Sequence, residues 1–375
     1  MLKKIALLIV LVLMTSCTSS TKPNAEEITS VDQVYLDSPT NFRIVKGNIE
    51  RRAKSGSFFS SDSRVEKDFD PIRVKAYASF QEFLSGQNSE NLELAIVVRP
   101  DVPKDIANYS VEQVRGAARF WGSRFPMGTK LDVLFVSEKD DEYMDSEGRE
   151  FVTSLDNYNR LKEIDSQFGN SWIMGEVRSN RSTNQFNSKL ILATTSFADT
   201  DRMDNGWIQV PAHETFHVIF DYYMSQKPVR SEGEYLRRAP QYFIEGAANY
   251  FGYSYAMKNL GWYSDGLDVS LSVIWKSLGT WRTVKTESDL IELLKATEGY
   301  APQQAFEASY ALGAIFTEWI VAEYGFEALI RILENLAKSD NFDQNLKSSI
   351  GIDKDEAYRK AAPYLLSIFT RLNIS

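Results

Sequence analysis

The chain has 375 residues, of which 43 % are hydrophobic, and this content supports a substantial core and excludes bulk disorder. The formal net charge is −9 with the charges interspersed, so the basic surface typical of nucleic-acid-binding proteins is absent. A single cysteine excludes an internal disulfide.

The first twenty residues predict an export signal that ends in a lipid attachment site. Lys3 and Lys4 precede an apolar run at 5–14, which is too short for a comfortable membrane span. The stretch LMTSC, ending at Cys17, resembles a slightly loose lipobox of bacterial lipoproteins. That resemblance implies cleavage before Cys17, a lipid on its thiol and a place in the cell envelope. The alternative is an ordinary secretory signal with a chance cysteine.

Residues 1–16 are therefore predicted to be a signal peptide. Residues 17–66 are rich in Ser, Thr, Asn and Lys, and they predict a tether with one short strand at 42–45. Residues 67–225 predict an α/β subdomain. Its expected strands are 92–98, 130–138 and 189–197, and its expected helices are 72–84, 110–125, about 155–168 and 208–224.

Two helix starts are predicted from local signals. Ser110 is the expected N-cap of the helix at 110–125, and Pro211 is expected in the first turn of the helix at 208–224.

From residue 226 to 375 the strand signals fade, and the sequence predicts a helical subdomain. The stretch VRSEGEYLRR at 229–238 is expected to be a solvated loop. The helical patterns lie at 240–258, 287–296, 304–324, 326–338 and 354–372. The expected fold class is α+β, with a mixed sheet and helices followed by an all-helical half.

Both histidines of the chain lie in the segment PAHETFH at 211–217. Residues four apart share a helix face, so His213 and His217 point the same way and can bind one Zn²⁺. Glu214 follows the first ligand and can take a proton from a metal-activated water and pass it to a leaving amine. The alternative is two core or surface histidines without a metal.

A catalytic zinc site needs a third protein ligand, and with no third histidine this must be a carboxylate. Glu245 lies inside the apolar pattern APQYFIEGAANYFGY at 239–253, where an unpaired carboxylate is costly. Its neighbours Gly246, Ala247 and Ala248 are small, which predicts close approach to the helix that carries the histidines. The other nearby carboxylates are Asp221, Glu232 and Glu234.

HETFH together with PQYFIEGAANY resembles the gluzincin metallopeptidases, most closely the collagenase-like, peptidase MA-like branch with its E-G-x-A-x-[FY] helix. The resemblance covers about residues 190–335, and the step of 28 residues from His217 to Glu245 is near the collagenase-type spacing. It implies a thermolysin-like zincin domain, one Zn²⁺ per chain and peptide-bond hydrolysis. By position it makes His213, His217 and Glu245 the metal ligands and Glu214 the base.

Three further residues have weaker support. Tyr310, in a helix that resembles a later helix of such enzymes, is a candidate donor to the oxyanion of the transition state; ordinary core packing is the alternative. Asn249, one turn after Glu245, is a candidate to orient a ligand histidine. Asp221 is an alternative orienter or a surface acid. The stretch 190–196 is either a substrate-binding edge strand or an interior strand.

The function that these features predict is a lipid-anchored zinc metallopeptidase, more consistent with an endopeptidase, acting on a peptide or protein substrate. The main alternative is a non-catalytic envelope lipoprotein that binds peptide or cell-wall material with a zincin fold. A zinc hydrolase of another amide is the third. Thr18 replaces the aspartate that retains lipoproteins at an inner membrane, so the outer membrane is favoured if the source has two.

The lipid anchor leads to a test by detergent phase partitioning. Lipidated Cys17 should carry the wild-type protein into the detergent phase, because an acyl chain buries apolar surface there. Cys17→Ala should shift the protein to the aqueous phase or block its maturation. Wild-type protein found wholly in the aqueous phase would refute the anchor.

Overall fold

The computed structural model describes the greater part of the chain. The predicted signal at 1–16, Cys17 and the helix expected at about 155–168 lie outside the described residues. Among the described helices, none combines the length and the apolar character needed to cross a membrane. The described residues are 34–35, 42–45, 48–52, 58–59, 66–87, 89, 91–102, 104–137, 139–152, 173–182, 185–194, 205–257, 259–279 and 281–374.

Four short strands precede the main fold and form an antiparallel sheet in the order β1-β2-β3-β4. They are β1 (Val34–Tyr35), β2 (Phe42–Val45), β3 (Asn48–Arg52) and β4 (Phe58–Phe59). Strand β2 confirms the strand predicted at 42–45. The prediction of a tether over 17–66 missed the other three, because strands of two to five residues are too short to show a clear alternation in the sequence.

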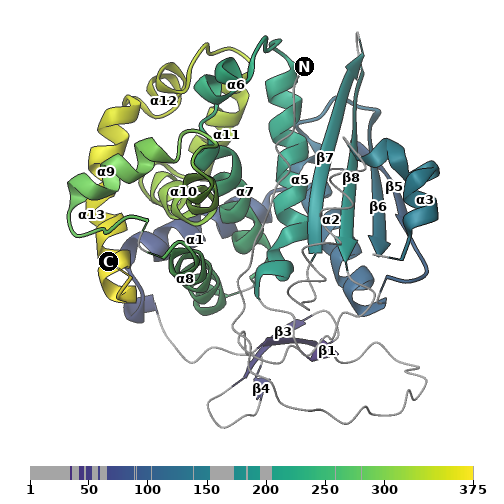
Figure 1. Cartoon of the computed structure of the whole chain (residues 1–375), viewed down its shortest axis with the longest axis horizontal. Helices are drawn as coiled ribbons and strands as arrows, with labels where there is room; N and C mark the ends of the chain where they lie inside the picture. Colours follow the sequence, from purple (N-terminus) through teal and green to yellow (C-terminus); the bar gives the residue numbers. More distant parts are fainter. Residues whose placement is uncertain are drawn as a thin grey trace.

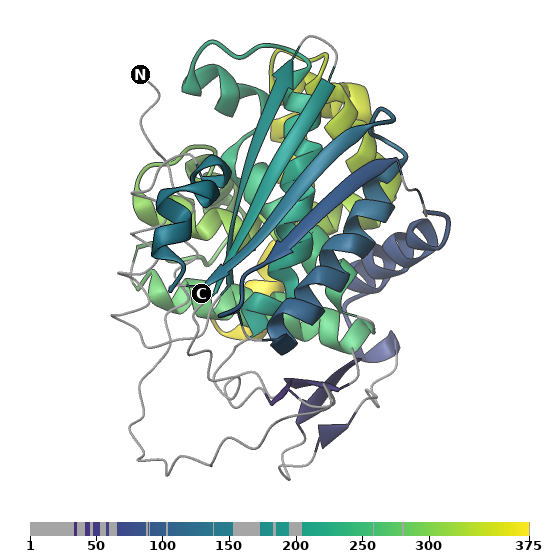
Figure 2. The ribbon, with the colours of Figure 1, turned by 90° about the vertical axis from the view of Figure 1, so that its right-hand side faces the viewer.

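The main sheet is mixed, with strand order β5-β6-β8-β7 (Figure 2). Strands β5, β6 and β8 are parallel, and β7 pairs antiparallel with β8. The three predicted strands are confirmed, whereas β7 was missed because its sequence, IMGEVRSNRS, lacks an apolar run. The bounds are β5 (Leu92–Val98), β6 (Thr129–Ser137), β7 (Ile173–Ser182) and β8 (Gln185–Thr194).

Strand β8 is therefore interior, between β6 and β7, and the edge strand on this side is β7. Of the two interpretations of 190–196, the interior strand is correct.

Helices cover the sheet unequally. Helices α2 (Lys104–Gly122) and α5 (Asn205–Ser225) lie on the face toward the helical layer, and the short α3 (Asp141–Asp145) lies on the other face (Figure 1). Successive side chains of β6 lie on opposite faces of the sheet. Val133 belongs to the main core, and Leu134 belongs to a smaller cluster around Met144. A parallel strand buried on both faces explains the continuous apolar run in its sequence.

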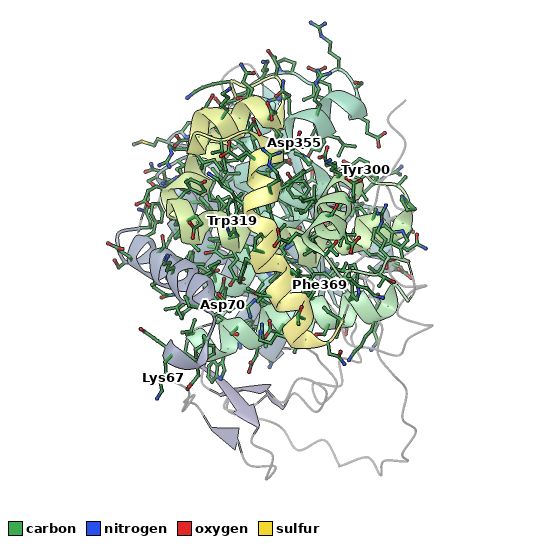
Figure 3. All side chains as sticks on the ribbon, turned by 90° about the vertical axis from the view of Figure 1, so that its left-hand side faces the viewer. Lys67, Asp70, Tyr300, Trp319, Asp355 and Phe369 are labelled. Atoms are coloured by element: carbon green, nitrogen blue, oxygen red, sulfur yellow. The ribbon has the colours of Figure 1, made fainter. Side chains whose placement is uncertain are left out.

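The rest of the fold is a layer of helices, and the mixed sheet with this layer confirms the α+β class. Figure 3 shows α13 crossing its outer side, with Asp355 near one end and Phe369 near the other. The helices predicted for this layer are confirmed, but α6, α8 and α12 were missed. The helices are α1 (Pro71–Ser85), α6 (Glu232–Arg238), α7 (Gln241–Ala256), α8 (Leu260–Ser277), α9 (Glu287–Ala296), α10 (Gln303–Tyr324), α11 (Phe326–Leu336), α12 (Phe342–Ile350) and α13 (Lys354–Leu372).

Two predicted helix starts and one predicted loop were wrong. Helix α2 begins at Lys104, so Ser110 is a buried interior residue and not an N-cap. Helix α5 begins at Asn205, which places Pro211 inside the helix. In α2, Ala107 lies before the expected start and packs into the core, so the helix extends further toward the N-terminus than Ser110.

The stretch predicted as a solvated loop contains α6, with Ser231 as its N-cap accepting from the Glu234 N–H. Arg238, at its end, is buried and donates to the carbonyls of Lys227 and Leu336. It thereby binds α6 to the ends of α5 and α11. Two arginines at the end of this stretch favour a solvated loop, but the guanidinium of Arg238 donates to carbonyls in the last turns of two helices.

Helix α1 packs in the helical layer, against α8, α10 and α11, although it precedes the sheet in sequence. Its anchor is Arg73, 1 % exposed, which binds Glu318 through two hydrogen bonds of 3.0 and 3.2 Å. Glu318 also accepts from the hydroxyls of Tyr263 and Tyr364. A buried ion pair is tolerated when its remaining hydrogen bonds are satisfied, as they are for this carboxylate.

Two glycines bring α7 and α10 together. A Cβ on Gly246 would lie 2.2 Å from the carbonyl carbon of Gly313, and a Cβ on Gly313 would lie 1.9 Å from the carbonyl oxygen of Tyr242. Gly246 was predicted to allow approach to the histidine helix, but it faces α10. The close approach of α7 to α5 is at Gly252, where a Cβ would lie 2.9 Å from the backbone oxygen of Gln209.

The glycine contact can be tested with Gly313→Ala. The added methyl group meets backbone atoms, which cannot move aside, so the free energy of unfolding should fall by about 3 kcal/mol, as is typical of overpacking. Chemical denaturation would measure the change. Gly233→Ala in α6 is the control, because no atom lies within 4 Å of its Cβ position, and alanine should be neutral or stabilising there. Equal stability of the two variants would contradict this account.

Candidate metal centre

Helix α5 presents His213, Glu214 and His217 toward the interior between the sheet and the helical layer. His213 and Glu214 are 0 % and 1 % exposed, and the His217 side chain is 12 % exposed. The imidazole Nε2 atoms of the two histidines lie 3.0 Å apart, as expected for residues one turn apart on the same face. The Glu214 carboxylate lies 3.9 Å from Nε2 of His213.

Helix α7 brings Glu245 to the same point. Its Oε2 atom lies 3.5 Å from Nε2 of His213 and 3.4 Å from Nε2 of His217. This oxygen is buried and accepts no hydrogen bond of ordinary geometry. Within the described residues, His213, His217 and Glu245 form the group of three side chains positioned to hold a metal ion.

The spacing of these three atoms fits a metal. Ligand atoms at about 2.0–2.1 Å from a tetrahedral zinc ion are about 3.3 Å apart. The three observed separations, 3.0, 3.4 and 3.5 Å, lie around this value. Two nitrogens and one carboxylate oxygen are also a donor set that zinc accepts, and a tetrahedral ion would keep a fourth position for water.

Asn249 fixes the tautomer of His213. Its Nδ2 donates to the carbonyl of Tyr310 at 3.1 Å, so its Oδ1 faces Nδ1 of His213, 2.8 Å away. A carbonyl oxygen at that distance requires a proton on Nδ1, and Nε2 then keeps its lone pair for a metal. The contact is the one expected of a residue that orients a ligand histidine.

The charges of the site are strongly coupled. Burial alone would lower the pKa of His217, but Glu245, with smaller contributions from Glu214 and Asp221, raises it to about 9. Burial would likewise raise the pKa of Glu245, but His217 and His213 lower it to about 2. The lone pairs of the two Nε2 atoms and of Oε2 of Glu245 repel one another at these distances. A proton on His217 or a bound cation is therefore needed to hold the three atoms together.

Asp221, one turn after His217, lies on the sheet side. Burial raises its pKa to about 6, opposed by a hydrogen bond from Ser179 of β7 and by the charge of His217. It affects His217 electrostatically but is not part of the group of three. Glu232 is exposed and Glu234 half-buried on α6, and neither is part of that group.

Tyr310 enters from α10. Its ring lies nearly parallel to the His213 imidazole, with the centroids 6.2 Å apart. Burial, followed by the charges of Glu245 and Glu214, raises the pKa of Tyr310 well above 10. Its hydroxyl is therefore a protonated donor beside the two carboxylates.

Gln241 was not predicted as a site residue. It lies one turn before Glu245, and its Nε2 donates to Oε1 of Glu245 at 3.2 Å. The i, i+4 spacing is the signal in the sequence that could have identified it.

Comparison of the sequence with protein-family models gives no match, and no curated protein matches it. The functional conclusion therefore depends on the motif and the geometry of the site.

The third ligand can be tested by zinc retention during dialysis against a graded chelator. Glu245→Ala removes the oxygen that faces both imidazoles. Loss of a residue that only hydrogen-bonds to a metal ligand lowers metal affinity by about 10–100-fold, so loss of the ligand itself should lower zinc affinity by roughly 100-fold or more. Asp221→Ala, Glu232→Ala and Glu234→Ala should retain zinc. Release of zinc by one of these three, with retention by the Glu245 variant, would identify a different ligand.

Proposed function

We propose that the chain is a zinc-dependent metallopeptidase that hydrolyses peptide bonds. The observation that carries the proposal is the convergence of His213, His217 and Glu245 beside the buried carboxylate of Glu214. A site that only bound a metal or a peptide would gain nothing from a second buried carboxylate next to the ligands, because its burial is costly. A general base explains its presence.

We also propose that the fold is thermolysin-like. Three features support this: the HETFH segment lies on a helix packed along a mixed sheet, the third ligand comes from a following helix, and a further helix supplies a tyrosine. Figure 1 shows α5 between the sheet and the helical layer, with α7 next to α5 and α10 next to α7. This arrangement supports the fold that the resemblance to gluzincins implies.

In this mechanism a bound zinc ion would polarise the scissile carbonyl and acidify water. Glu214 takes the proton from the attacking water and delivers it to the leaving amine nitrogen. Asn249 keeps His213 in the tautomer whose Nε2 is available. Tyr310, a buried phenol, donates a hydrogen bond to the carbonyl oxygen as that oxygen gains negative charge.

The substrate is proposed to be a peptide or protein that binds beside β7. This strand is the sheet edge next to α5, and an extended peptide can add to such an edge through backbone hydrogen bonds. His217 is the most exposed of the three ligands, so access is easiest on its side. An endopeptidase is favoured, as in the sequence-based expectation.

The proposed location is the cell envelope, with a lipid on Cys17 that holds the protein at a membrane surface and with the outer membrane favoured in a two-membrane source. The support is the apolar run followed by LMTSC in the sequence.

The mechanism is tested with Glu214→Gln on a diverse peptide pool, with cleavage products mapped by mass spectrometry. The substitution keeps the three ligands and the shape of the side chain but removes the base, so the rate should fall by about 10²–10⁴-fold. A chelator should abolish cleavage by the wild-type protein.

Zinc content is the control for this experiment. Elemental analysis should give about one zinc per chain for both proteins, because Glu214 is not a ligand. Full activity of the variant would refute the base, and absence of cleavage by zinc-loaded wild-type protein across the pool would favour a binding role.

A further inference from the structure

Gln241 donates a hydrogen bond to Glu245, the third proposed ligand, and the backbone of Gln241 is itself held by hydrogen bonds. The side chain is 1 % exposed and lies at the start of α7. The N–H of Gln241 donates to the carbonyl of Glu298 at 3.0 Å, and the N–H of Tyr242 donates to the carbonyl of Thr297 at 3.1 Å. These two backbone hydrogen bonds fix the first turn of α7 independently of the Gln241 side chain.

The orientation of the Gln241 amide is determined by Glu245. Nε2 donates to Oε1 of Glu245, while Oε1 of Gln241 is buried and has no hydrogen-bond partner. The opposite orientation would place a carbonyl oxygen against a carboxylate oxygen, and the two would repel each other. Leaving a buried acceptor unsatisfied is unfavourable, so the bond to Glu245 must outweigh that cost.

The two oxygens of Glu245 consequently have different partners. Oε1 faces the Gln241 amide, and Oε2 faces the two histidine nitrogens at 3.5 and 3.4 Å. A carboxylate free to rotate could present both oxygens to a metal and occupy an additional coordination position. A carboxylate with one oxygen held by a hydrogen bond presents only its other oxygen to a metal.

We propose that Gln241 is a positioning residue that restricts Glu245 to ligation through Oε2 and keeps a coordination position open for water. This inference rests on the proposed metal centre and assigns the residue that controls its coordination number. If Gln241 only satisfied a buried carboxylate, its loss would lower stability and leave the coordination of the metal unchanged.

The test uses Co²⁺ titrated into the metal-free full-length protein, because four-coordinate Co²⁺ absorbs visible light more strongly than five- or six-coordinate Co²⁺. Gln241→Met keeps the length of the side chain and removes the donor. The visible absorption per bound Co²⁺ should decrease, and the affinity should fall by roughly 10–100-fold.

The matched control is Gln303→Met. Gln303, at the start of α10, donates from Nε2 to Oε1 of Glu307 at the same 3.2 Å and the same i, i+4 spacing, but on the exposed surface. This variant should match the wild type in spectrum and affinity. If Gln241→Met fails to fold, Gln241→Asn, whose amide is one methylene shorter, takes its place with the same expected decreases.

If the Gln241 variant has the Co²⁺ spectrum and the Co²⁺ affinity of the wild type, the proposal is overturned. This holds also when the melting temperature of the variant is lower, because Gln241 then contributes only to stability. Failure of the wild-type protein itself to take up Co²⁺ would instead refute the metal centre, before any variant is compared.

Discussion

The carboxylate of Glu245 is buried in a layer of apolar helices, and its position depends on the two imidazoles that face it. Removing such a charge from water costs several kcal/mol unless partners replace the lost hydration. Here His213 and His217 face one oxygen and Gln241 the other. The partners come from two helices, so the group of His213, His217 and Glu245 forms only when α5 and α7 pack in this register.

The packing of the helices follows from small residues and one buried ion pair. Gly246 and Gly313 allow α7 and α10 to touch through their backbones, and Gly252 does the same between α7 and α5. Arg73 and Glu318 attach α1 to α10 from the other side. The helix that carries Glu245 is thus confined by both neighbours, and a ligand geometry defined to a few tenths of an ångström requires such confinement.

The sequence predicted the elements whose patterns are long and apolar, and it predicted that His213, His217 and Glu245 would lie together. It failed where a tertiary partner determined the structure. Strand β7 is polar, and it forms because it pairs with the edge of β8. Arg238 is buried because carbonyls near the ends of two helices accept its hydrogen bonds. Gly246 was correctly associated with close packing but assigned to the wrong helix, since one sequence carries no information on which neighbour a small residue faces. Gln241 was overlooked because glutamine on a helix is usually exposed.

Asn249 indicates how the site limits its negative charge. An aspartate at this position could also hold the Nδ1 proton of His213, and it would make the imidazole a stronger donor to a metal. It would also add a third carboxylate to a buried site that already contains Glu214 and Glu245. The amide fixes the same tautomer without a charge, and its other end is satisfied by the Tyr310 carbonyl. The same contact ties the tyrosine helix to the ligand helix, so the proposed oxyanion donor and the oriented histidine are held by one side chain.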